Sequence, residues 1–148
     1  MGKEIWSVPT WYFFHGLAAR IIKDFYEKNY MSVWINIYQN ICMNLPCPMC
    51  KKHATIYIKK SKVSDIETKE KLITYLFDFH NYVNGKIGKP IYKKKDLEKY
   101  NYLKLKKCYY LVNRSFNFGY SGQMFAWQRR KGIKKTTEYL QLVWNNVK

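Results

Sequence analysis

The sequence predicts an all-α fold, and three observations support this prediction. Apolar residues recur at intervals of three and four along most of the chain, which is the spacing of one helix face. Asn, Gly and Pro separate these periodic segments. No segment alternates apolar and polar residues convincingly, although the short runs 56–58 and 109–112 are ambiguous. With 148 residues, one domain is expected.

The first expected helix begins near Pro9, because proline is tolerated in the first turn of a helix. It should run to about residue 28, on an apolar face formed by Trp11, Phe14, Leu17, Ala18, Ile21, Ile22 and Phe25. A second helix is expected over residues 32–43. The segment Asn44-Leu45-Pro46 then interrupts the pattern.

A third helix should begin at Pro48, with Cys47 at or beside its cap, and continue through Tyr57. After a polar connection, a fourth helix is expected over residues 67–84. The residues that end it are Gly85, Gly88 and Pro90.

The C-terminal third is basic and aromatic. We expect a basic helix over 96–107, a Tyr-, Phe- and Gly-rich stretch over 109–122, and a last helix over 136–146. From residue 103 onward there are ten basic residues and one acidic residue, Glu138, in a chain of net charge +17. A solvated basic surface is the simplest explanation, but this charge would also attract an acidic client protein or nucleic acid.

No targeting signal is recognisable in the sequence, so we expect a cytoplasmic protein. No run approaches the about 18 apolar residues that span a bilayer. The N-terminal residues lack the basic-then-apolar layout of a signal peptide. Cytosolic thiols are kept reduced, so the four cysteines are unsuited to a passive disulfide framework. A close cysteine pair in that compartment is more often catalytic or metal-binding.

Cys47 and Cys50 form such a pair at the start of an expected helix. Both sulfurs would lie on one face, and the positive end of the helix would favour a thiolate. The pair could then accept electrons from a client dithiol by thiol–disulfide exchange. The spacing alone leaves open a structural disulfide, or a zinc site made of Cys42, Cys47, Cys50 and His53.

Two polar pairs stand on otherwise apolar helix faces. Trp11 and His15 are four residues apart, as are His80 and Asn84, so each pair shares one face. Taken alone, Trp11 and His15 are better explained by core packing. A buried asparagine, however, is costly unless its amide has a defined partner. The pairs together therefore suggest a buried, planar, polar ligand.

Three motifs in this order resemble the Erv/ALR family of FAD-linked sulfhydryl oxidases, in particular the short versions carried by large cytoplasmic DNA viruses. They are Trp6-Ser7-Val8-Pro9-Thr10-Trp11 followed by His15, Cys47-Pro48-Met49-Cys50, and His80-Asn81-Tyr82-Val83-Asn84 followed by Gly88-Lys89-Pro90. The resemblance spans about residues 5–92. It implies a four-helix bundle around FAD over residues 1–102, with residues 103–148 as a helical extension.

The resemblance also implies roles for single residues. Cys47 would receive the client thiol, and Cys50 would face the flavin. Helical residues would cradle the adenine and ribose, with Lys89 near the phosphates. The implied cofactor contacts are Trp11, His15, Arg20, Cys50, His80, Asn81, Val83, Asn84, Lys86, Lys89 and Tyr92.

The activity that the resemblance implies is disulfide formation in partner proteins, with electrons passed to oxygen to give hydrogen peroxide. The client would be a protein dithiol, such as a thioredoxin-like or small redox relay protein. A viral enzyme of this kind would act on virion proteins in the host cytoplasm or in the virion. A homodimer packed through the first helices is also implied.

The chain departs from the family pattern at several positions. Ser7 replaces a common glycine, Leu45 a common tyrosine, and Arg20 an aromatic residue; Arg20 could instead approach a phosphate. A basic-tryptophan pair that closes over the flavin is missing, and Tyr100 or Tyr102 could substitute for it.

The two remaining cysteines are not explained by these motifs. We expect Cys42 to be a buried free thiol, while Cys108 lies beyond the recognisable domain. A disulfide between them is left open. The chain has no second Cys-x-x-Cys to relay electrons, so Cys47 should react directly with its partner.

Overall fold

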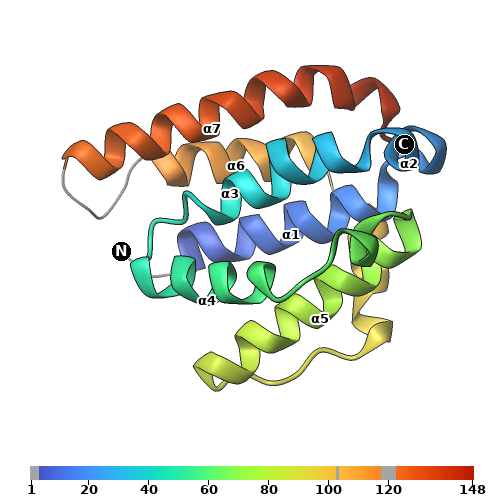
Figure 1. The fold of residues 1–148 in the computed structure, drawn as a ribbon, viewed down its shortest axis with the longest axis horizontal. Coiled ribbons are helices and arrows are strands. Elements are labelled where there is room, and N and C mark those ends of the chain that lie inside the picture. Colours follow the sequence, from blue (N-terminus) through green and yellow to red (C-terminus); the bar gives the residue numbers. More distant parts are fainter. Residues whose placement is uncertain (1–3, 103, 118–122) are drawn as a thin grey trace.

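Helix α1 (Glu4–Arg20) lies at the centre of the molecule. The computed structural model describes residues 4–102, 104–117 and 123–148. Because α1 carries apolar residues all round, it must be covered on several sides. Helices α5 (Lys69–Ile87) and α6 (Leu105–Asn117) cover it, together with the 3-10 helix η3 (Lys94–Tyr102). Figure 1 shows α1 between α6 and α5.

The all-α prediction is confirmed. Among the described residues, β pairing is limited to an isolated bridge between Ile21 and Val147. The two ambiguous runs, 56–58 and 109–112, are both helical. None of the described helices combines the length and the apolar character needed to cross a membrane.

The first expected helix is interrupted earlier than predicted. α1 ends at Arg20, and α2 (Lys23–Val33) starts after an extended Ile22. The C-terminal segment causes this break, because the Ile22 N–H donates to the Asn146 carbonyl oxygen at 2.7 Å. Near the expected break, α2 has only a kink at Asn29 (φ −129°, ψ 18°). It continues into the π-helix η1 (Trp34–Gln39) and α3 (Asn40–Cys42).

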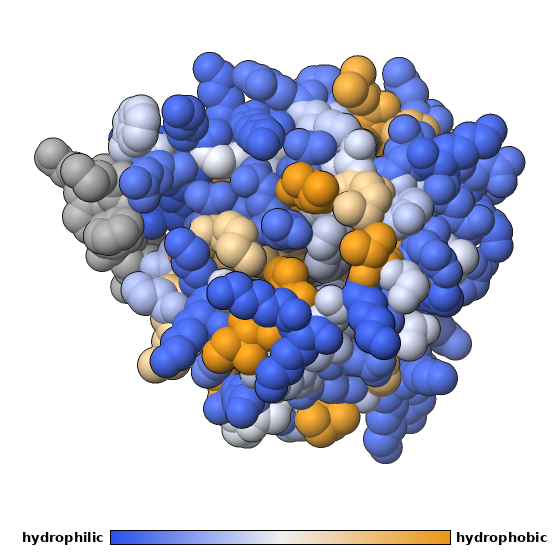
Figure 2. Space-filling model, viewed as in Figure 1, coloured by the Kyte–Doolittle hydropathy of each residue, from blue (hydrophilic) through white to orange (hydrophobic). Residues whose placement is uncertain are grey.

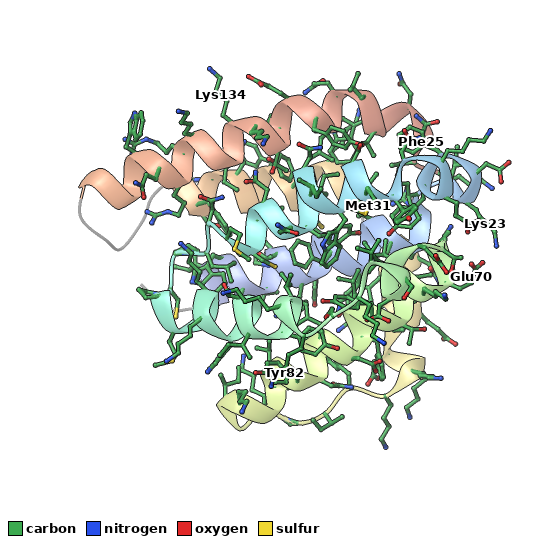
Figure 3. All side chains as sticks on the ribbon, viewed as in Figure 1. Lys23, Phe25, Met31, Glu70, Tyr82 and Lys134 are labelled. Atoms are coloured by element: carbon green, nitrogen blue, oxygen red, sulfur yellow. The ribbon has the colours of Figure 1, made fainter. Side chains whose placement is uncertain are left out.

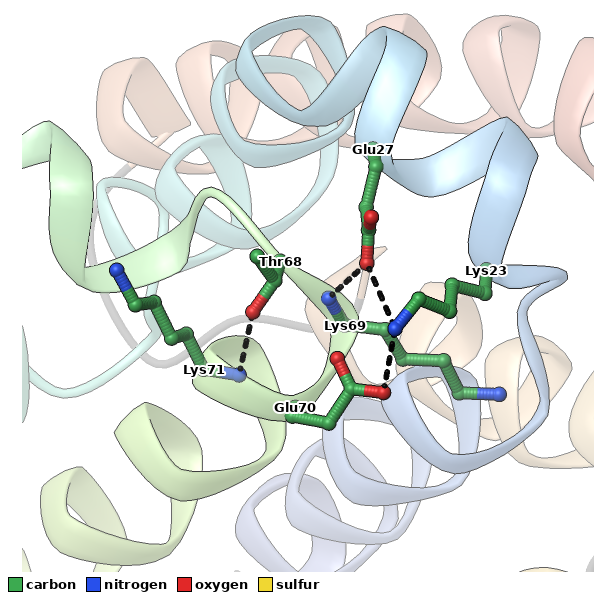
Figure 4. A network of polar contacts seen from close by, with 6 residues as sticks. All are labelled: Lys23, Glu27, Thr68, Lys69, Glu70 and Lys71. Atoms are coloured by element: carbon green, nitrogen blue, oxygen red, sulfur yellow. Dashed lines mark hydrogen bonds and ion pairs between the residues drawn. The ribbon is translucent and has the colours of Figure 1, made fainter.

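The third and fourth expected helices form close to the predicted positions. α4 (Pro48–Lys59) begins at Pro48, and a short 3-10 helix, η2 (Val63–Ile66), connects it to α5. The α5 start is tied to α2, because Glu27 accepts the Lys69 N–H at 3.2 Å and Lys23 bridges Glu27 and Glu70 (Figure 4). Gly88, at φ 75°, ends α5 in the left-handed conformation that favours glycine.

The predicted helix over 96–107 is wrong. η3 covers Lys94–Tyr102, and α6 starts afresh at Leu105. The Asp96 carboxylate accepts the Lys93 N–H at 2.8 Å, which fixes the turn at the start of η3. The last predicted helix exists but is longer: α7 spans Gln123–Val143, and η4 (Trp144–Asn146) completes it.

The C-terminal helices share one hydrophobic core with α1. The Phe13 ring lies 5.0 Å from that of Tyr109, and the Trp6 ring lies 6.3 Å from that of Phe116. Leu140 on α7 is fully buried. Although α5, α6 and η3 cover much of α1, Ile5 and Val8 remain exposed on it. The dimer packed through the first helices stays a prediction.

The outer surface is mainly hydrophilic in the view of Figure 2, with scattered apolar side chains. On α7 the exposed side chains include Arg130, Lys131, Lys134 and Lys135, and Figure 3 shows Lys134 pointing away from the body. Arg129 differs, because it is buried and its Nε donates to the Phe116 carbonyl oxygen at 2.9 Å. The basic surface of the extension therefore excludes Arg129.

Candidate functional site

The cysteine pair lies at the start of α4. Cys47 is the N-cap, with an extended backbone (φ −101°, ψ 116°), and Pro48 occupies the first turn. The Cys50 N–H donates to Cys47 Sγ at 3.2 Å, and the two sulfurs are 2.7 Å apart. A donor at a helix N-terminus stabilises negative charge on the Cys47 sulfur. The geometry suits a pair that opens and closes a disulfide.

Cys50 also lines a cavity of about 500 Å³. This volume lies in the range of small-molecule and cofactor sites. α1, α4, α5 and the segment after α5 form most of its wall. The predicted site residues that line it are Trp11, Cys50, His80, Val83, Asn84, Lys89 and Tyr92.

Stacked rings join α1 to α5 at this cavity. The Trp11 and His80 rings are parallel, with centroids 3.9 Å apart and an interplanar angle of 4°. His15 Nε2 and His80 Nδ1 are 2.8 Å apart, so one ring donates a hydrogen bond to the other. Tyr100 stacks on the other side of His15 at 4.6 Å. The two predicted polar pairs are thus brought together, as the hypothesis of a shared ligand requires.

Both histidines are neutral at physiological pH. Burial lowers the pKa of His15 to about 3, and the positive charge of Lys99 acts in the same direction. Burial likewise lowers the pKa of His80 to about 2, with smaller contributions from His15, Lys99 and Lys89. A hydrogen bond between two rings requires one donor and one acceptor, which neutral imidazoles provide.

The two asparagines hold the segment after α5 in place. The Asn81 side chain accepts the Tyr92 N–H at 2.8 Å and donates to the Tyr92 carbonyl oxygen at 3.1 Å. Asn84 Nδ2 donates to the Pro90 carbonyl oxygen at 3.2 Å. These bonds account for two polar residues on an apolar helix face. Asn84 lines the cavity, whereas Asn81 shapes its wall from behind.

Besides Asn81, three predicted cofactor contacts do not line this cavity. Arg20 is at the far end of α1, where its Nε donates to the main-chain oxygen of Lys148 at 2.6 Å, and it lines a different cavity. Lys86 is exposed, with its ammonium 5.5 Å from the Tyr82 ring centroid. His15 reaches the main cavity only through Trp11 and His80.

Sequence reasoning missed several lining residues. The ammonium of Lys99 lies 5.1–5.3 Å from the ring centroids of Tyr12, Tyr92 and Tyr100, at the rim of the cavity. Its position beside the missing family tryptophan was the available signal. Tyr100 is buried against His15 and lines a different, smaller cavity, so its role as a substitute for that tryptophan stays a prediction. The side chain of Tyr102, the other candidate, lies outside the described residues.

The other cysteines do not support a metal site. Within the described part of the chain, no group of three or more His, Cys, Asp or Glu residues is arranged to hold a metal ion. Cys42 is a buried free thiol, as predicted, and burial raises its pKa to about 12. It lines the same cavity as Cys50. Cys108 is a half-buried free thiol on α6.

Comparison with known proteins agrees with this geometry. The model of the Erv1 / Alr family matches residues 8–103. The chain is similar to "Putative FAD-linked sulfhydryl oxidase 096R" of Invertebrate iridescent virus 3, with 31% identity over 88 residues that cover 59% of each protein. It therefore spans less than two thirds of the length of that relative.

Two further relatives come from different sources. One is the FAD-linked sulfhydryl oxidase of African swine fever virus, 32% identical over 89 residues that cover 58% of this chain and 71% of that protein. The other is the mitochondrial FAD-linked sulfhydryl oxidase erv1 of Schizosaccharomyces pombe. It is 30% identical over 86 residues that cover 56% of this chain and 46% of that protein. No solved structure matches the chain. Since the family model covers well over half of its residues, this chain belongs to the Erv1/Alr family.

Proposed function

We propose that the protein is an FAD-dependent thiol oxidase that forms disulfides in partner proteins. The observation that carries this proposal is the position of the cysteine pair. Cys50 lines the cavity, while Cys47 caps the helix beside it and is partly exposed. One sulfur is therefore accessible to a client, and the other faces the space for a cofactor.

The residues of the cavity fit FAD. Trp11, Phe14 and Phe79 supply aromatic walls for a planar ring system. Lys89 and Lys99 at the rim supply positive charge for a diphosphate. The relatives named above are FAD-linked oxidases, which supports the same cofactor. We assign cofactor contacts to the predicted residues that line the cavity and to Lys99, with His15 and Asn81 holding that wall.

The chemistry of the pair follows from its geometry. A client thiolate attacks Cys47 Sγ of the Cys47–Cys50 disulfide, which forms a mixed disulfide and releases Cys50 as a thiolate. A second client thiolate then attacks the client sulfur of that mixed disulfide. The client leaves with its own disulfide, and Cys47 departs as a thiolate, which the Cys50 N–H stabilises. The client has lost two electrons, and the cysteine pair has gained them.

Bound FAD would supply the two-electron acceptor that re-oxidises the pair, with oxygen as the final acceptor and hydrogen peroxide as the product. We further propose that it forms disulfides in virion proteins, in the host cytoplasm or virion; two similar sulfhydryl oxidases come from viruses, which is consistent with this role. The client would be a protein dithiol, such as a small redox relay protein. The exposed basic side chains of α7 would attract an acidic client rather than take part in the chemistry. We also propose a homodimer packed through the first helices, where Ile5 and Val8 are exposed.

Flavin content and the Cys50→Ser variant test the proposal. The purified protein should be yellow, release FAD on denaturation and consume oxygen with dithiothreitol. Cys50→Ser should keep its FAD but lose turnover, because only the sulfur is removed. Cys47→Ser, in contrast, should leave a Cys50 thiolate that gives a long-wavelength absorption band with bound FAD. A colourless protein with stoichiometric zinc, or wild-type turnover in Cys50→Ser, would refute the proposal.

A further inference from the structure

Helix α7 is hydrogen-bonded to the helix that leads into the cysteine pair. Asn40 Nδ2 lies 2.6 Å from the Gly132 carbonyl oxygen and 2.7 Å from Thr136 Oγ1, and donates to both. The Thr136 hydroxyl donates to the Asn36 carbonyl oxygen at 2.7 Å. Residues 36 and 40, like residues 132 and 136, are four apart, so one face of each helix meets the other. These hydrogen bonds thus fix the position of α7 along η1 and α3.

Gly132 allows the Asn44 side chain to lie directly against α7. A Cβ atom at position 132 would be 2.4 Å from Asn44 Nδ2 and 2.7 Å from Asn44 Oδ1, which is too close for any real contact. Among the described residues, a positive φ occurs at Gly88 and not at Gly132. Close approach, rather than backbone freedom, therefore explains a mid-helix glycine that costs about 1 kcal/mol relative to alanine.

Asn44 begins the short segment that ends at Cys47. Its side chain donates to the Asn40 carbonyl oxygen at 2.7 Å, and its N–H donates to the Ile41 carbonyl oxygen at 3.0 Å. Only Leu45 and Pro46 follow before Cys47; Pro46 is buried, and Leu45 lines the cavity. The atoms that a Cβ at position 132 would strike belong to the Asn44 side chain, so Gly132 acts through the bond of that side chain to Asn40. Because the segment to Cys47 is short and constrained, loss of this bond would be passed on to Cys47.

We infer that Asn40, Asn44 and Gly132 are positioning residues for the redox cysteine pair. Gly132 acts from α7, outside the segment that the family model matches. The three residues act through the 44–46 segment, which sets the exposure of Cys47 Sγ and its 3.2 Å bond from the Cys50 N–H. The inference deepens the proposed function and rests on it. It assigns the extension a part in setting how fast Cys47 reacts.

Gly132→Ala tests the inference. The readout is the alkylation rate of Cys47 by iodoacetamide in the reduced protein, followed by mass spectrometry, because this rate requires no turnover. We expect about a tenfold change, since displacements near 1 Å at a reacting group have large effects. Gly85→Ala is the matched control: it is also inside a helix, but a Cβ there meets nothing within 4 Å. Its alkylation rate should equal that of the wild type.

A second substitution provides the rescue. Gly132→Ala combined with Asn44→Ala removes the side chain that the new Cβ would strike, so the rate should return toward that of Asn44→Ala alone. Simple destabilisation of α7 would not be relieved in this way. An unchanged rate in Gly132→Ala would overturn the inference. So would a double variant whose rate differs from that of Asn44→Ala as much as the rate of Gly132→Ala differs from that of the wild type.

Asn40→Ala covers the case in which Gly132→Ala does not fold, as judged by circular dichroism. It removes the two bonds to α7 without adding bulk, and Lys135→Ala on the exposed face of α7 is its control. Equal Cys47 alkylation in Asn40→Ala and wild type would contradict the inference. Failure of the proposed function is seen separately, as a wild-type protein that neither binds FAD nor oxidises dithiothreitol.

Discussion

The family-matched part of the chain and its C-terminal helices contribute different things to the molecule. Residues 8–103 hold both cysteines of the proposed redox pair, the histidine pair and all of the described lining of the main cavity except Trp6 and Ser7. α6 and α7 supply none of the described lining, yet they bury Val112, Phe116, Leu140 and Val143 in the same core as α1. The segment that holds the chemistry is therefore shorter than the unit that folds.

Helix α1 shows why the two parts depend on each other. Trp11 turns toward the cavity and stacks on His80, whereas Phe13 packs against Tyr109 and Trp144 of the C-terminal part. Both faces belong to one rigid helix. Loss of the packing around Phe13 should therefore disturb the position of Trp11.

The largest effect should come from removing core volume in the extension. Leu140→Ala should lower the free energy of unfolding by about 3 kcal/mol, because Leu140 is fully buried and its loss leaves a cavity. Leu142→Ala, two residues away and 68% exposed, should change it by less than about 0.5 kcal/mol. Urea unfolding measures both. Equal stabilities would mean that α7 does not belong to the folding unit.

A somewhat smaller loss is expected from His80→Ala with Asn84→Ala. Because His80 bonds to His15 and Asn84 to Pro90, part of this loss should also appear without the flavin. Two polar groups at about 1 kcal/mol each should weaken FAD binding about tenfold or more. The melting temperature with excess FAD should fall accordingly, since a ligand stabilises only the folded state that binds it. Thr74→Ala, on the exposed face of α5, is the control. Full flavin occupancy in the double variant would mean that both residues only pack in the core and do not bind FAD.

The histidine pair should make stability fall in acid. In the unfolded chain both rings take up protons near the ordinary pKa of about 6.5, but in the folded protein they stay neutral until about pH 3 and pH 2. Below pH 6.5 the unfolded state therefore binds more protons, and the free energy of unfolding decreases. The slope approaches about 1.4 kcal/mol per pH unit for each histidine.

Urea unfolding between pH 7.5 and pH 5.5 measures this slope. His15→Gln should reduce this slope, because it removes one of the two buried rings. A wild-type stability that is constant over this range would show that the buried pair is not neutral as described.

The smallest effect, and the most specific, concerns the exposed charge of α7. Changing Arg130, Lys131, Lys134 and Lys135 to glutamine should leave oxidation of dithiothreitol unchanged. Oxidation of an acidic protein client should slow about tenfold at low salt and little at high salt, because ions screen long-range attraction. Arg129 is left intact, since it is buried. Loss of flavin or of small-dithiol turnover would mean that this surface supports the catalytic part directly.

Local sequence signals predicted much of the site and the fold. Pro48 placed the start of α4 and made Cys47 its cap, and the four-residue spacings put Trp11 with His15 and His80 with Asn84. The errors lie where distant segments decide the local structure. The chain breaks at Ile22 because Asn146 bonds there, and α6 could not be separated from η3 by periodicity alone.

Lys86 and Lys99 show the difference between what the sequence determined and what the tertiary structure decided. The sequence by itself determined the helical class, the cysteine pair at the start of α4 and the two polar pairs, because these depend on residues at most four positions apart. It could not tell that Lys86 points to solvent while Lys99 lies at the cavity rim. Nor could it tell that Arg20 would donate a hydrogen bond to the Lys148 main-chain oxygen, or that the Asn44 side chain would lie against Gly132. Spacing sets the face of a helix that a residue occupies, but the neighbour that covers that face is chosen by packing of the whole chain.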